Sequence, residues 1–370
     1  MKYVWKSAQG IRGFDFERAK YVDFPTLGGA LTEPERAKIS LEFGEDWCEL
    51  TPSDPWEGAM PLPMKAFINI TKRCNFKCTH CFNDSGKRDA AEMDIATLND
   101  LFDQLEALHI FHVTISGGEP LYHSEWSALI EALQHRQLSF SLVSNGALFN
   151  ERIIAGLNAL PYFRGVTVSL DGVDAATNDH VRGRGSFNQA CQGLAQLSRH
   201  ATFDVSLRTT LHTDNTSHID RLIDVAAKFN IGHIKVNALN PYGRARHLMD
   251  KVLDNQDYLA IRQSLHDAGQ LQNIRVEVPS QKYVAKEGLV GLCRSGQDSF
   301  EVDADGTVYP CSFTFGQLAQ GNVHHQSLRE IVGKMAGFTL DNPVCAGCKG
   351  RGGQQEKVLG AVSSLIERKQ

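Results

Sequence analysis

Three cysteines, Cys74, Cys78 and Cys81, constrain this chain more than any other feature, through their C-x3-C-x2-C spacing. They follow a short apolar run at 66–70 that predicts a strand, so one loop would bring the three thiols around a common centre. Thiolates are soft ligands that select iron–sulfur clusters, zinc or copper(I). A four-iron cluster with three cysteines keeps one iron open, whereas His80 would complete a zinc site. The spacing alone leaves both metals open.

The composition is that of a globular chain with one large domain and an appendage, or with two domains. Of the 370 residues, 42% are hydrophobic and 22% are charged, with a formal net charge of -5. This charge gives no attraction toward nucleic acid or an anionic membrane. We find no apolar run of 18 residues and no secretion signal, so we expect a cytoplasmic protein. In a reducing cytosol, clustered cysteines bind metal or act in catalysis more often than they form disulfides.

Strands and helices alternate between residues 64 and 240. The predicted strands are 66–70, 111–115, 139–143, 165–170, 204–211 and 232–236, and the intervening helices are 95–108, 124–134, 150–160, 186–198 and 217–229. Repeated βα units predict a parallel sheet that is either curved into a barrel or open and doubly wound. In both cases the chemistry collects on loops at the C-terminal ends of the strands. Residues 1–63 contain a predicted short helix at 33–43 and a Pro-rich exit. We interpret this segment as an arm that packs on the domain.

Polar and glycine-rich segments follow these strands, as that rule requires. The second strand ends in Ser116-Gly-Gly-Glu-Pro120, the third in Ser144-Asn-Gly146, the fourth in Asp171-Gly172 and the sixth in Asn237. Taken alone, each segment has the residues of an ordinary turn. Together with the cysteine loop, they predict one rim that carries three thiolates and a glycine pair open to close approach by a ligand.

Two motifs, the C-x3-C-x2-C cysteines and Ser116-Gly-Gly-Glu-Pro120, carry a resemblance to a known family. Through them, residues 64–240 strongly resemble the radical S-adenosylmethionine (SAM) superfamily. The resemblance implies a partial (β/α)6 barrel and a [4Fe–4S] cluster whose open iron binds SAM. It further implies reductive cleavage of SAM to a 5′-deoxyadenosyl radical that abstracts hydrogen from a substrate. A flavodoxin or ferredoxin would donate the electron.

The resemblance also assigns cofactor contacts. Gly117, Gly118 and Glu119 would hold the methionine amine, and Ser144 and Asn145 stand where the family often has Thr-Asn-Gly. The ribose and the methionine carboxylate would be contacted by Ser169, Asp171 and Arg182, although surface solvation remains an equal alternative for Arg182.

A second group of cysteines lies beyond the predicted barrel. Cys293 and Cys311 flank a predicted β-hairpin, and Cys345-Ala-Gly-Cys348 adds a C-x2-C pair. Four thiolates complete a zinc site or an iron–sulfur site. The segment 169–187 and the later Pro241-Tyr-Gly-Arg-Ala245 resemble the SPASM and twitch branch, which binds auxiliary clusters. No cysteine follows Cys348, so the set resembles the twitch arrangement with one auxiliary [4Fe–4S] cluster.

Two cysteines remain outside both groups. Some radical epimerases in this superfamily return a hydrogen atom from a cysteine thiol, and Cys191 or Cys48 would be the candidate here. Burial as a small apolar residue is the commoner fate of a lone cysteine such as Cys191 in a predicted helix.

These features predict three parts: residues 1–63 as an N-terminal extension, 64–246 as the barrel, and 247–370 as a twitch-like or SPASM-like domain. The resemblance implies a ribosomally made peptide as substrate, which is cross-linked, epimerised or oxidised. The alternatives are oxidation or epimerisation of an aminocyclitol or sugar, and a maturase of a folded protein. A non-catalytic zinc-binding scaffold is the alternative of a different class.

Overall fold

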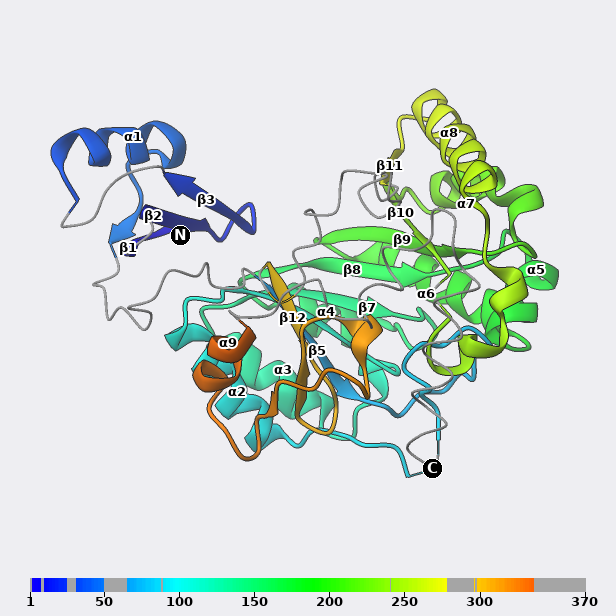
Figure 1. Ribbon diagram of the computed structural model, residues 1–370. Coiled ribbons are helices and arrows are strands. Elements are labelled where there is room, and N and C mark those ends of the chain that lie inside the picture. The colour runs from blue at the N-terminus through cyan, green and yellow to red at the C-terminus, as the bar shows by residue number, and fades with distance from the viewer. Residues whose placement is uncertain are drawn as a thin grey trace.

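The fold is that of a computed structural model (Figure 1), in which the structure describes residues 2–7, 10–24, 31–49, 65–87, 89–239, 241–277, 296 and 298–335. A ten-stranded sheet has the order β11-β10-β9-β8-β7-β6-β5-β12-β13-β14. All neighbours from β11 to β12 are parallel, and β13 and β14 continue the sheet antiparallel. The strands are β5 (Lys65–Thr71), β6 (His112–Gly117), β7 (Ser139–Ser144), β8 (Phe163–Ser169), β9 (Asp204–Leu211), β10 (His233–Ala238), β11 (Arg275–Glu277), β12 (Ser299–Val302), β13 (Thr307–Tyr309) and β14 (Gly321–Asn322).

Helices connect the parallel strands and pack on the outer face of the sheet. The α-helices are α2 (Ile95–Ala107), α3 (Trp126–Gln134), α4 (Glu151–Asn158), α5 (Ala175–Arg182), α6 (Ser186–His200), α7 (Leu222–Lys228), α8 (Asn255–Leu271) and α9 (Leu328–Met335). Short 3-10 turns are η1 (Pro120–Tyr122), η2 (Thr216–Arg221), η3 (Gly243–His247), η4 (Met249–Lys251) and η6 (Ser312–Thr314). The structure therefore confirms the alternating α/β class and the partial barrel.

The two faces of the sheet differ because side chains alternate along each strand. On the outer face, Val168, Leu207 and Ile234 are fully buried in one large core together with the helices. On the inner face, Thr167 of β8 lies in register with Ser206 of β9, and their hydroxyl oxygens are 3.0 Å apart. The inner face is therefore polar, as a surface that meets a ligand would be.

The N-terminal segment has a sheet of its own, which the sequence did not predict. Its strands are β1 (Lys2–Ser7), β2 (Gly10–Asp15), β3 (Lys20–Phe24) and β4 (Cys48–Glu49), in the order β3-β2-β1-β4, and α1 (Glu33–Phe43) covers one face. Val4, Ile11, Ile39 and Phe43 form a small separate core under α1.

The other face of this sheet packs on the barrel, as expected for an arm. The Tyr21 hydroxyl donates to the carbonyl of His109 at 3.0 Å and accepts from the Phe111 amide at 2.6 Å. Tyr3 and Phe16 place their rings 5.6 and 5.3 Å from that of Phe111. Because Phe111 directly precedes β6, the N-terminal sheet lies against the N-terminal ends of the barrel strands.

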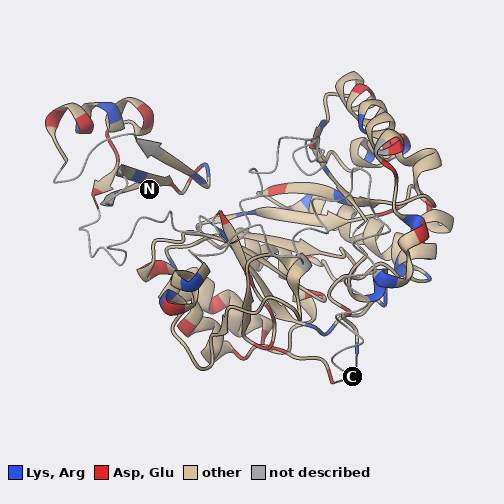
Figure 2. Cartoon of the chain, in the orientation of Figure 1, with Lys and Arg blue, Asp and Glu red and all other residues tan. Residues whose placement is uncertain are grey.

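Charges of both signs are interspersed over the helices (Figure 2), in keeping with the small net charge. No helix within the described ranges is long and apolar enough to cross a membrane. The division at residues 63 and 246 stays a prediction, and the Pro-rich segment 52–63 lies outside the described residues.

Candidate active site

The three cysteines lie on the loop that leaves β5, at the C-terminal end of the sheet. Cys78 is buried, and Cys74 and Cys81 are partly buried. Burial, with smaller contributions from Glu119 and the other two cysteines, raises the pKa of the Cys74 thiol to about 12. Burial also raises the pKa of Cys78. Thiolates at these positions therefore need a cation beside them.

The cysteine loop is not arranged around a single metal ion. Among the described residues, no group of three or more His, Cys, Asp or Glu side chains has that geometry. His80 turns its Nε2 to Asp171 Oδ2 at 2.6 Å instead of completing a zinc site. The thiolates of a four-iron cluster bind different irons, so they stand farther apart than the ligands of one ion. The loop fits a cluster better than zinc.

Several contacts fix the shape of this loop, and the Arg244 side chain makes three of them. Its Nε donates to the carbonyl of Cys78 at 2.8 Å, and its Nη1 donates to Asp84 Oδ1 and to the carbonyl of Ser85 at 3.0 and 2.6 Å. Gly243 has φ +58°, and a Cβ there would lie 2.1 Å from the carbonyl oxygen of Phe82. The Gly-Arg pair that follows β10 therefore clamps the loop that follows β5.

The glycine pair after β6 packs directly on the cysteine loop. Gly118 N donates to the carbonyl of Thr71 at 2.7 Å, and Glu119 N donates to the carbonyl of Arg73 at 2.9 Å. A Cβ on Gly118 would lie 2.2 Å from that Arg73 oxygen, so only glycine fits. The sequence predicts that a ligand approaches this glycine pair closely. In the structure, the backbone that approaches is that of the cysteine loop.

Glu119 is fully buried where three strand ends meet. Its carboxylate accepts from Ser144 Oγ at 2.8 Å, from Asn145 N at 2.7 Å and from Leu121 N at 3.2 Å. Burial outweighs these hydrogen bonds and raises the pKa of Glu119 to about 7. Asn145 Nδ2 lies 3.9 Å from Cys74 Sγ, which links the β7 end to the cysteine loop. The expected residues Glu119, Ser144 and Asn145 are thus brought together.

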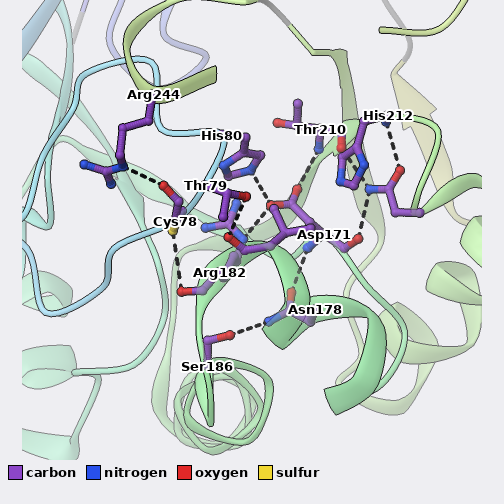
Figure 3. A network of polar contacts seen from close by, with 12 residues as sticks. Cys78, Thr79, His80, Asp171, Asn178, Arg182, Ser186, Thr210, His212 and Arg244 are labelled. Atoms are coloured by element: carbon purple, nitrogen blue, oxygen red, sulfur yellow. Dashed lines mark hydrogen bonds and ion pairs between the residues drawn. The ribbon is translucent and has the colours of Figure 1, made fainter. Parts of the chain in front are cut away.

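Asp171 is the centre of a second network, drawn in Figure 3. Its Oδ2 lies 2.6 Å from His80 Nε2 and 2.7 Å from Arg182 Nε, and its Oδ1 accepts from Thr210 N at 2.7 Å. Burial alone would raise the pKa of Asp171, but Arg182 and then His80 outweigh burial and hold this pKa well below its usual range. The Cys78 thiol in turn donates to the carbonyl of Arg182 at 3.8 Å. Asp171 therefore holds His80 and Arg182 in place beside the cysteines.

Buried polar atoms without partners mark where a ligand would fit. His80 Nδ1, both amide atoms of Asn83 and Ser85 Oγ make no hydrogen bond in the described part of the chain. All three residues lie on or next to the cysteine loop. An unsatisfied buried polar group is costly, so such groups usually meet a ligand or water. The residues present fit a cluster with a polar cofactor beside it.

The remaining expected residues are placed differently. Ser169 ends β8 and lies in register with Arg208 of β9. Cys191 lies on α6, in the outer helical layer near Lys228, where burial raises the pKa of its thiol. Cys48 is exposed on β4. The structure brings neither of these two cysteines to the cysteine loop, and a hydrogen-donor role for either stays a prediction.

The hairpin of the second cysteine group is confirmed by β12 and β13, and β12 pairs with β5 beside the cysteine loop. Cys311 follows β13, whereas Cys293, Cys345 and Cys348 lie outside the described residues. Phe82 and Phe315 place their rings 6.0 Å apart, so the segments that follow Cys81 and Cys311 are in contact.

Sequence reasoning did not single out Arg244, Arg208 or the pairing of His80 with Asp171. Of these, only Arg244 lies in a segment that the sequence marks by its resemblance to the SPASM and twitch branch, Pro241-Tyr-Gly-Arg-Ala245. The other two relationships depend on strand register and loop conformation.

Comparisons with known sequences agree with this geometry. Residues 68–226 match the sequence model of the Radical SAM superfamily, and residues 293–349 match SPASM, an iron-sulfur cluster-binding domain. The mycofactocin maturase MftC of Mycolicibacterium smegmatis is 28% identical over 279 residues, which cover 73% of this chain and 70% of the relative. The antilisterial bacteriocin subtilosin biosynthesis protein AlbA of Bacillus subtilis is 24% identical, covering 80% of this chain and 65% of the relative.

Solved structures show the same fold. Streptococcus suis SuiB bound to precursor peptide SuiA superposes with a TM-score of 0.72 at 14% identity, covering 97% of this chain and 91% of that one. Native anSMEcpe with bound AdoMet and the Kp18Cys peptide superposes with a TM-score of 0.59 at 21% identity, covering 73% and 80%.

Proposed function

The chain is a radical SAM enzyme of the SPASM and twitch branch, and we propose that its substrate is a ribosomally synthesised peptide, in which it cross-links, epimerises or oxidises an unactivated carbon. The peptide assignment is supported by relatives named as a mycofactocin maturase and a subtilosin biosynthesis protein. The main support for a cofactor site here is that the cysteine loop lies beside Glu119, Ser144 and Asn145 at one edge of the sheet.

Each residue of the site has a proposed role toward the cofactors. Cys74, Cys78 and Cys81 would hold the SAM-binding [4Fe–4S] cluster, and Cys311 with Cys293, Cys345 and Cys348 would hold one auxiliary [4Fe–4S] cluster. When bound, the cluster and SAM supply a 5′-deoxyadenosyl radical.

The polar residues position the cofactor. Glu119, fixed by Ser144 and Asn145, would carry the negative charge that pairs with the methionine ammonium, helped by the backbone of Gly117 and Gly118. Ser169 and Arg182 would contact the ribose or the methionine carboxylate. Asp171 would contact the cofactor together with them, and its contacts with His80 and Arg182 also position those two side chains.

Two further parts of the proposal concern the surroundings of the reaction. A flavodoxin or ferredoxin would supply the electron, as the family resemblance implies. We expect a cytoplasmic location, since reduced clusters and free thiols persist in a reducing compartment.

Anaerobic reconstitution tests the cofactor assignment. Two cubane clusters predict about eight irons and eight sulfides per chain. With dithionite and SAM, the enzyme should release 5′-deoxyadenosine, and Cys78→Ala should not. Cys48→Ala is the matched control because this cysteine is exposed and distant from the loop. Zinc without sulfide in the wild-type protein would contradict the assignment.

The peptide assignment needs a separate experiment. The enzyme, SAM and reductant are incubated with the short peptide encoded next to its gene, and the product is analysed by tandem mass spectrometry. A mass change at one residue, with transfer of deuterium from a labelled peptide into 5′-deoxyadenosine, is the expected result. Turnover of a sugar or aminocyclitol from the neighbouring pathway, with no change in the peptide, would favour the alternative substrate class.

A further inference from the structure

Three neighbouring strands each contribute one polar side chain to the same row on the inner face of the sheet. Ser169 of β8 lies in register with Arg208 of β9, and Arg208 lies in register with Lys235 of β10. The intervening residues, such as Val168 and Leu207, are fully buried on the opposite face. Ser169, Arg208 and Lys235, here called the inner row, therefore point toward the inside of the barrel.

The inner row is held by neutral partners. Lys235 Nζ donates to Thr167 Oγ1 at 3.3 Å, and Thr167 contacts the hydroxyl of Ser206. Arg208 places its Nε and Nη2 each 2.7 Å from the side-chain oxygen of Asn237, with the Asn237 amide oriented so that its oxygen faces the guanidinium. These contacts fix the two cations without neutralising either.

Neither cation of the inner row forms an ion pair with a carboxylate in the part of the chain that the structure describes. Burial lowers the pKa of both side chains, and the positive charge of Arg208 lowers the pKa of Lys235 further. Two like charges side by side in a partly buried place repel each other, so an anion there would be stabilised.

The acids that face Arg208 and Lys235 are engaged elsewhere. Asp171 is paired with Arg182 and His80, as described above. Glu277, next to Lys235 on β11, lies 3.1 Å from His233 Nε2. Glu301 on β12 accepts hydrogen bonds from Ser312, and burial raises the pKa of its carboxyl to about 7. Glu301, Asp171 and Glu277 favour the charged form of Arg208, and Glu277 also favours that of Lys235, but none of the three forms an ion pair with either cation in the described part of the chain.

We propose that Arg208 and Lys235 form an anion subsite that binds a carboxylate of the substrate. A guanidinium fork beside an ammonium suits a carboxylate, and the hydroxyls of Ser169 and Thr167 add donors. Ser169 also belongs to the rim expected to hold SAM, so an anion on the row would lie beside the cofactor.

This inference rests on the proposed function, because a ribosomal peptide brings carboxylates and no phosphate. The carboxylate comes either from the C-terminus of the peptide or from an Asp or Glu side chain. Both sources share the same chemistry, and the experiment below separates them.

Thermal unfolding of the SAM-bound, cluster-loaded enzyme tests the subsite without any reductant. Three small probes are added: N-acetylglycine, which mimics a C-terminus; N-acetylaspartic acid α-amide, which mimics a side-chain carboxylate; and neutral N-acetylglycinamide. A carboxylate probe at about ten times its dissociation constant should raise the melting temperature by roughly 2 °C. The carboxylate probe that gives the larger rise identifies the source, and the neutral probe should give none.

Variants test whether the rise in melting temperature depends on the inner row. Arg208→Gln and Lys235→Met should each abolish the rise, while Lys228→Met, an exposed lysine on α7, should keep it. Iron content and circular dichroism report whether each variant is folded and loaded. Should either row variant fail to fold, ¹³C line broadening of labelled N-acetylglycine by the wild-type enzyme decides instead: the broadening should persist with excess neutral N-acetylglycinamide and disappear with excess unlabelled N-acetylglycine.

The inference would be overturned by no rise with either carboxylate in the wild type, by an equal rise with the neutral probe, or by a rise that survives in both row variants. A rise seen only without SAM would assign the row to the cofactor and also overturn it. Failure of 5′-deoxyadenosine release by the wild type would remove the proposed function but leave the carboxylate measurement intact, so the two failures are distinguishable.

Discussion

Lys72 Nζ lies 2.5 Å from Asp303 Oδ2, and this ion pair joins the cysteine loop to the β12–β13 hairpin that precedes Cys311. Lys72 is two residues before Cys74, and Asp303 is 4% exposed. The two cysteine-bearing segments are therefore connected through a charge pair as well as through Phe82 and Phe315.

Removing Lys72 should destabilise this junction. Among the described residues, Lys72→Met leaves the buried Asp303 carboxylate with only the Ala304 amide as donor, and we expect a loss of roughly 1–3 kcal/mol in the free energy of unfolding. Urea unfolding checks this value, and a double-mutant cycle with Asp303→Asn isolates the pair. Lys87→Met is the control, since the exposed Lys87–Asp84 pair should contribute less than about 1 kcal/mol. Equal effects of the two variants would contradict the prediction.

The buried carboxyl of Glu119 should make stability depend on pH. The pKa of Glu119 is about 7 in the folded protein, which is above its value in an unfolded chain. Its contribution to the stability of the fold is therefore full below about pH 4.5 and is lost as the pH rises through 7. Glu119→Gln removes this titration, so the stability of the SAM-free variant should not decline between pH 5 and 8 as that of the wild type does. The same variant should bind SAM more weakly. A stability difference that is independent of pH between 5 and 8 would rule out this account.

Asp171→Asn should separate cluster binding from SAM binding. The variant leaves Arg182 buried without its counter-charge and loosens His80, so we expect a loss of about 3–5 kcal/mol in stability and weaker SAM binding. Iron content should be retained because no cysteine is changed. Equilibrium dialysis with labelled SAM and iron analysis measure the two properties, and unchanged SAM affinity in a folded variant would contradict the positioning role.

The clamp made by Arg244 should determine how long the cluster persists. Arg244→Ala removes three donors from the cysteine loop, at a cost of roughly 2 kcal/mol, and should speed loss of iron to a chelator. Arg246→Ala, at an exposed position two residues on, is the matched control. Indistinguishable iron release from the two variants would show that the loop does not depend on the clamp.

Hydrophobic periodicity predicted most of the barrel but not the N-terminal sheet. The predicted helix at 33–43 and strand at 204–211 match α1 and β9, and Asp94 caps α2 by accepting from Thr97 N. In β1, Val4 faces the small core while Trp5 faces the barrel, so both faces are buried. Such a strand has no polar alternation to reveal it. In place of the helix expected at 217–229, the structure has the 3-10 turn η2, which contains non-helical backbone at His218, followed by α7.

The site was predictable where spacing along the chain carries the chemistry. Cysteine spacing and the Gly-Gly-Glu-Pro segment identified the cysteine loop and its neighbour. The partner of Gly118 was not visible, because it is a backbone carbonyl on another strand end. The inner row was equally hidden, since Arg208 and Lys235 become neighbours only through the register of β9 and β10.

The packing of Tyr21 on Phe111 limits how this chain can be shortened or recombined. A fragment that starts at residue 65 would expose the ring of Phe111 and leave its amide without the Tyr21 hydroxyl. Exchange of the N-terminal sheet between relatives as a cassette would therefore require redesign of the barrel surface around Phe111 and Tyr162.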